Sequence, residues 1–209
     1  METKFTEQQS LEVITEMINR ARNNVQKNSA NNMIYSGFIV ALIAVANFIL
    51  MHFLPDAYGR YSFHIWWLIV PSTFVDRYIK RKLDRSAMVK TQIDSIITQL
   101  WRGFSISVVI LLLSIFAICF SFHAWIASLL ITPGIMIMVA LVEFGMAKVC
   151  RYKPFFWGAI AFWTGSLLCL LTYSLLNRGD LHFLILAACM IIGFIIPGYQ
   201  LNKSAEKNV

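Results

Sequence analysis

Long runs of apolar residues dominate the chain from residue 33 onward. A helix needs about 20 apolar residues to cross the hydrocarbon core of a bilayer, and six segments meet or approach this length. They lie at residues 33–54, 62–79, 103–122, 124–147, 155–176 and 181–200. Because only the connection between the second and third runs is long, we expect an all-α polytopic membrane protein with six transmembrane helices arranged as three hairpins.

Two polar stretches outside these runs carry apolar residues at the three-to-four spacing of an amphipathic helix. One lies within residues 1–32 and the other within the basic connection at about 77–102. We therefore expect two cytoplasmic amphipathic helices, a transmembrane domain at 33–200 and a cytoplasmic tail at 201–209. The two helices either shield the ends of the bundle, which we favour, or lie on the membrane surface or pair with each other.

The composition excludes a soluble protein. Hydrophobic residues make up 58% of the 209 residues and charged residues only 14%, whereas globular chains run at roughly 45–50% apolar and about 25% charged. A soluble enzyme, a disordered chain and a disulfide-rich secreted module are all inconsistent with these values. The four cysteines form no CxxC pair, so we interpret them as small apolar packing residues.

The distribution of the basic residues predicts the orientation. Sixteen of the 18 Lys and Arg residues fall in the N-terminal segment, the long connection, the turn after the fourth run and the tail. By the positive-inside rule these segments are cytoplasmic, which places both termini inside a bacterial cytoplasmic membrane. The net charge of +7 then favours contact with anionic lipid headgroups. Nucleic acid is not an expected partner, because the charges are divided among four short segments.

The four histidines all fall near the predicted outer face. Ser62–Trp66 reads Ser-Phe-His-Ile-Trp, Ser121–Trp125 reads Ser-Phe-His-Ala-Trp, and His182 follows His123 at the same interval of 59 residues. The interval indicates either an ancient triplication of one hairpin or chance similarity among aromatic-rich segments. His52, at the end of the first run, has no counterpart in this repeat.

These histidines carry one candidate site. Imidazole binds zinc, copper and haem iron, so His64, His123 and His182 would form a metal or haem site if the even-numbered spans converge, with Asp180 or Asp56 as a further ligand. The alternative, which we favour, is that they are interfacial residues like the neighbouring tryptophans. On that interpretation no cofactor is expected.

Glu143 is the one acidic residue well inside an apolar run. An intramembrane carboxyl group is a functional candidate by default. Its position, about 28 Å past the outer end of the fourth run at about 1.5 Å per residue, places it near the cytoplasmic interface. This depth favours a structural ion pair with Arg102 or Lys148. A role in proton or cation coupling is the alternative.

Several short motifs resemble a group of short, uncharacterised bacterial multi-pass membrane proteins with six spans. They are the stretch Tyr152–Phe155 followed by Gly158 and Trp163, the N-terminal stretch from Ser10 to Ile18, and the ending Ile195–Tyr199. The resemblance implies an integral membrane protein and supplies no catalytic residues, since the activity of that group is unknown.

The first functional hypothesis is a non-enzymatic scaffold, accessory or regulatory membrane protein that acts through a protein partner or as a homo-oligomer. It follows from the absence of phosphate-binding loops, HExxH, GxSxG and CxxC motifs. A small transporter or channel is the second hypothesis, and it predicts a polar cavity lined by residues such as Asn47, Thr164 and Ser166. The third is the metal- or haem-binding protein described above.

Overall fold

The computed structural model describes residues 7–54, 60–75 and 92–207, and these are helical throughout apart from short turns. The long helices are α1 (Glu7–Phe53), α4 (Gln92–Phe122), α5 (Ile131–Cys150) and α6 (Lys153–Leu176). The last crossing consists of α7 (Leu181–Met190), the π-helical segment η4 (Ile191–Ile195) and α8 (Ile196–Lys207). Two 3₁₀ segments, η1 (Arg60–Leu68) and η3 (Trp125–Leu130), complete the described fold, with helix continuing after η1 over residues 69–75.

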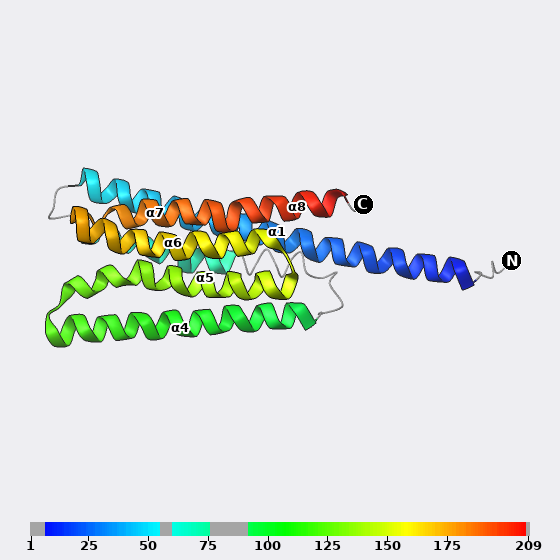
Figure 1. The fold of residues 1–209 in the computed structure, drawn as a ribbon, viewed down its shortest axis with the longest axis horizontal. Helices are drawn as coiled ribbons and strands as arrows, with labels where there is room; N and C mark the ends of the chain where they lie inside the picture. The colour runs from blue at the N-terminus through cyan, green and yellow to red at the C-terminus, as the bar shows by residue number, and fades with distance from the viewer. Residues whose placement is uncertain (1–6, 55–59, 76–91, 208–209) are drawn as a thin grey trace.

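The helices form one elongated antiparallel bundle (Figure 1). In the bundle α4 packs on α5, α5 on α6 and α6 on the last crossing, while α1 closes the arrangement by packing along α7, η4 and α8. The two chain termini lie at the same end, and the N-terminal part of α1 extends beyond the other helices (Figure 1). The last crossing is the most central, since 56% of its apolar window is buried against 11% for α4.

Among the described residues, five helices are long and apolar enough to cross a membrane. They confirm an all-α fold and are compatible with a multi-pass membrane protein. They are Ala30–Phe53, Ser95–Phe122, Ile126–Cys150, Lys153–Leu176 and Leu181–Ser204. The sixth predicted span, at 62–79, is not confirmed. Within the described residues, its apolar helical stretch covers only His64–Val75, which is shorter than the roughly 20 residues a straight crossing requires.

Two helices of the structure run across the boundaries between the predicted amphipathic segments and the apolar runs. The N-terminal segment is not a separate helix, because α1 runs from Glu7 into the first apolar run without a break. The helix predicted at about 77–102 lies outside the described residues up to residue 91, and from Gln92 it is the beginning of α4 and passes Gly103 uninterrupted. Helix α8 likewise continues through most of the predicted tail, to Lys207.

Local sequence explains the turns that separate α5, α6 and α7. Arg151 and Asn177 end α5 and α6 in the left-handed conformation, both with φ of 52°. The amide of each bonds back into the preceding helix, on Ala147 and Tyr173 respectively. Pro154 stands in the first turn of α6, where the missing amide hydrogen costs nothing. These tight reversals place α5, α6 and α7 side by side.

Candidate functional site

The candidate site is the carboxyl group of Glu143, on the buried face of α5. The residue is 0% exposed, and neither carboxyl oxygen has a hydrogen-bond partner. Buried polar groups in proteins are bonded in the large majority of cases, so two free oxygens on one buried side chain are exceptional. Glu143 stands seven residues before the end of α5, about 10 Å along the helix axis.

Two glycines from different helices provide the space for this carboxyl group. A Cβ atom at Gly158 of α6 would overlap Oε2 of Glu143, and it would lie 3.1 Å from Cδ. A Cβ atom at Gly193 of η4 would lie 3.3 Å from Oε1 and would overlap the ring of Phe162. The same added atom at Gly158 would lie 3.0 Å from the Cα of Gly193, so the α6 and η4 backbones meet beside the carboxyl group.

The sequence explains why the last crossing is irregular here. Pro197 has no amide hydrogen and its ring clashes with the carbonyl of the residue four positions earlier in a regular helix. In the structure the helix widens just before it, and the amide of Ile196 bonds to the Ile191 carbonyl, five residues back. π-Helical segments of this kind occur frequently at functional sites. The widened turn contains Gly193 and therefore forms one wall of the Glu143 site.

The ion pair predicted for Glu143 is not formed. Neither Arg102 nor Lys148 bonds to its oxygens, and both of these basic residues are exposed. Lys148 instead places its Nζ 5.5 Å from the ring centroid of Phe144, a cation–π arrangement. The prediction failed because Glu143 points into the α5–α6–η4 contact, whereas Lys148, five positions later, faces outward.

Other buried polar side chains lie along the bundle interior. Ser166 of α6 donates to the Pro133 carbonyl of α5 at 3.0 Å, and Nε2 of His182 lies 2.7 Å from the Cys169 carbonyl. Asn47 of α1 is 0% exposed, and its amide has no partner. The interhelical bond that such a residue predicts is therefore not made. Thr164, a predicted cavity residue, bonds to the Ile160 carbonyl of its own helix at 2.9 Å.

The structure does not bring His64, His123 and His182 together. The part of the chain that it describes contains no group of three His, Cys, Asp or Glu residues placed to hold a metal ion. The three repeat positions have different conformations. His64 lies in the 3₁₀ segment η1, His123 has a φ of 52° after α4, and His182 is buried in the first turn of α7.

Of the two acidic residues proposed as further ligands, Asp180 pairs with an arginine and Asp56 is not described. Asp180 bonds to Arg178, with Nε of the guanidinium 3.0 Å from Oδ1. This hydrogen bond is the main reason that the pKa of Asp180 is held below its ordinary value. Asp56 lies outside the described residues. A salt bridge with Arg178 therefore engages Asp180, one of the two carboxylates that the metal hypothesis offered as a further ligand.

Comparisons of the chain with protein-family models, with curated proteins and with solved structures were made. None matches. The resemblance to short bacterial six-span proteins therefore stays a prediction.

Sequence reasoning identified Glu143 but missed the residues that shape its site. Gly158 was noted only as part of a motif, and Gly193 was not identified. Pro197 was the signal that could have identified Gly193. A proline inside an apolar helix predicts a distortion in the preceding turn. A glycine in that turn indicates a close approach between helices.

Proposed function

We propose that this protein is a non-enzymatic membrane protein whose activity depends on Glu143 binding and releasing a proton, as in a small proton-coupled transporter or channel. The observation that carries the proposal is the complete burial of a carboxyl group whose two oxygens have no partner. An ionised carboxylate in such surroundings costs several kcal/mol even after relaxation, on the order of the effective penalty per buried ion. The closed bundle therefore holds the carboxyl group in its neutral form.

Release of the proton requires a change in the surroundings of Glu143. A carboxylate needs donors or water, and in the closed bundle Gly158 and Gly193 hold the helix backbones against it. Separation of η4 from α6 would admit water and stabilise the charge. Protonation would favour the close contact again. Proton exchange is thus coupled to movement of the last crossing, for which the π-helical turn before Pro197 is the flexible element.

The same proposal includes six crossings as three hairpins, with both termini in the cytoplasm of a bacterial cell. Two features support it. The chain termini lie at one end of the bundle, and α1 ends at the opposite end from the start of α4 (Figure 1). The described apolar helical stretch His64–Val75 lies between these two helices in the chain and supports a further crossing. Sixteen of 18 basic residues belong to segments that this topology places on one side, as the positive-inside rule requires.

A distance measurement across the site tests the coupling. Spin labels at Trp157 of α6 and Tyr199 of α8, both mostly exposed, report the separation of the two walls in reconstituted protein. We expect the distance to increase as the pH rises in the wild type and to stay at its short value in Glu143→Gln, which keeps the shape and cannot ionise. Arg102→Gln, a charge removal on the exposed face of α4, serves as the control and should behave as wild type.

Two results would overturn this proposal: a wild-type distance that does not change with pH, or an equal change in Glu143→Gln.

Proton flux into liposomes under an imposed potential addresses transport separately. Flux that is abolished by Glu143→Gln supports a channel or transporter. A pH-dependent distance without flux refutes transport. The proton-controlled movement would then act on a partner protein or on another copy of the chain.

That outcome corresponds to a second candidate, a scaffold or regulatory protein that acts through a partner or as a homo-oligomer. One observation favours it: α1 extends past the end of the bundle as continuous helix (Figure 1). Removal of residues 1–29 would then abolish function while leaving the apolar window from Ala30 onward intact. Retention of full function without this segment would exclude it as the partner-binding element.

A further inference from the structure

Two shallow grooves flank the first turns of α8 at the end of the bundle where the chain termini lie. The first has a volume of ≈ 430 Å³ and is lined by Ile34, Ile195, Ile196, Tyr199, Gln200 and Lys203. The second has a volume of ≈ 370 Å³ and is lined by Tyr152, Pro154, Gln200, Lys203 and Ser204. Gln200 and Lys203 belong to both grooves and therefore stand on the ridge between them.

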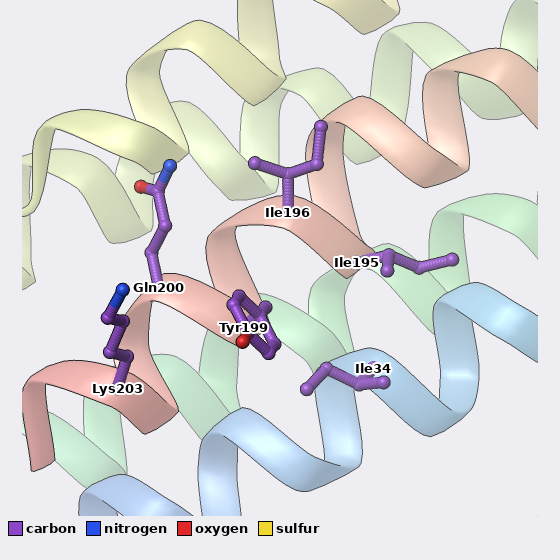
Figure 2. A pocket seen from close by; sticks show the side chains of 6 residues that line it. All are labelled: Ile34, Ile195, Ile196, Tyr199, Gln200 and Lys203. Carbon is purple, nitrogen blue, oxygen red and sulfur yellow. The ribbon is translucent and has the colours of Figure 1, made fainter. Parts of the chain in front are cut away.

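The first groove changes from apolar to polar along its length. In Figure 2 the isoleucines lie toward one end, Tyr199 lies in the middle, and Gln200 and Lys203 project at the other end. Ile196, Tyr199, Gln200 and Lys203 follow the spacing of one helix face. An amphipathic molecule with a hydrocarbon part and a polar head would match this sequence of side chains.

The position of the groove determines which amphipathic molecule is available. Lys203 is in the last turn of the candidate span Leu181–Ser204, where the hydrocarbon core gives way to headgroups. Within the described part of the chain, Lys203 has no acidic partner, since the one ion pair found there joins Arg178 and Asp180. Further positive charge is close, because Arg151 and Lys153 flank Tyr152 of the second groove.

We propose that these grooves bind an anionic phospholipid, with its phosphate on Lys203 and Gln200 and an acyl chain along Ile34, Ile195 and Ile196. The ammonium group supplies the opposite charge, the amide of Gln200 supplies a neutral donor, and the isoleucines cover hydrocarbon. The site lies on the outside of α8 and does not involve the Glu143 carboxyl group. The inference therefore goes beyond the proton-binding role and does not depend on it.

Lipid binding to the purified protein tests this inference. Detergent-solubilised protein is titrated with phosphatidylglycerol or with zwitterionic phosphatidylcholine, and bound lipid is counted by native mass spectrometry. We expect phosphatidylglycerol to bind more tightly. Lys203→Gln should weaken it by about fivefold, the equivalent of about 1 kcal/mol for one basic residue at a membrane surface. Lys148→Gln removes the same charge from α5 at a residue that lines neither groove, and should leave binding unchanged.

Other outcomes would overturn the proposal. Equal weakening by Lys203→Gln and Lys148→Gln would indicate diffuse attraction to a basic face rather than a site. Equal affinity for the two lipids would exclude recognition of the charge. Displacement of phosphatidylglycerol by millimolar inorganic phosphate would identify a free anion, and not a lipid, as the ligand. Both lysines are exposed, so neither substitution opens a cavity in the interior, although Lys148→Gln also removes the cation–π contact with Phe144.

Discussion

The substitution Gly158→Ala tests directly whether the carboxyl group of Glu143 occupies the contact between α6 and η4. The added methyl group would overlap Oε2, lie 3.1 Å from Cδ and lie 3.0 Å from the Cα of Gly193. The carboxyl group is at the end of a side chain and can rotate, although Glu143 is 0% exposed and other side chains surround it. The Gly193 backbone cannot yield without separating the helices.

The expected cost follows from overpacking of a well-packed interior, typically about 1–3 kcal/mol. The upper part of this range applies if the carboxyl group is forced toward the ring of Phe162, which already contacts Gly193. The higher helix propensity of alanine offsets little, because membrane-spanning helices stay helical when they dissociate. We expect Gly158→Ala to destabilise the bundle by about 2 kcal/mol.

Equilibrium unfolding in mixed micelles measures this change, and the chain offers a matched control. An added Cβ at Gly103 of α4 would meet nothing within 4 Å, so Gly103→Ala should change the unfolding free energy by less than about 0.5 kcal/mol. In a Glu143→Ala background the methyl group loses one of its two obstacles. Gly158→Ala should then cost about 1 kcal/mol less than it does in wild type. Equal effects of Gly158→Ala and Gly103→Ala, or no coupling to Glu143, would refute the packing described here.

Two further predictions concern other bonds of the bundle. Ser166→Ala removes the bond to the Pro133 carbonyl and should cost about 0.6 kcal/mol, the average for interhelical bonds in membranes. Thr164→Ala, whose hydroxyl bonds within its own helix, should cost less in the same unfolding assay, and the opposite order would contradict the assignment. Because Arg178 holds the pKa of Asp180 below its ordinary value, the pair stabilises the α6–α7 turn above about pH 3.9, the unfolded pKa. This contribution is lost as the pH falls through the lower folded pKa. Asp180→Asn should abolish that acid-dependent decrease in unfolding midpoint, and an unchanged pH profile would exclude the pair as its source.

Hydropathy predicted most of the fold because each crossing must bury its backbone bonds within one apolar helix. Five predicted spans agree with the observed helices to within a few residues except where α1 and α4 extend beyond the apolar run. The change near residue 32 from an amphipathic to an apolar pattern marks a change of environment and not a helix end, so α1 continues through it.

The site was only partly predictable. The sequence placed Glu143 inside an apolar run, but it could not show which way the side chain points. Depth along the helix suggested an ion pair with Arg102 or Lys148, whereas rotation about the helix axis determines that Glu143 faces Gly158 and Gly193. The histidines illustrate the same limit. Their equal spacing in sequence did not show whether the three imidazole rings lie close together. Among the described residues no group of three metal ligands is formed.

The central claim is that Glu143 is a neutral carboxylic acid in the closed bundle, and infrared spectroscopy tests it most directly. Protonated carboxyl groups in apolar surroundings absorb separately from carboxylates, and the difference between wild type and Glu143→Gln isolates this one residue. The account predicts a protonated-acid band at neutral pH that disappears in Glu143→Gln. A carboxylate band at neutral pH that Glu143→Gln removes would show that Glu143 is ionised and would contradict the account.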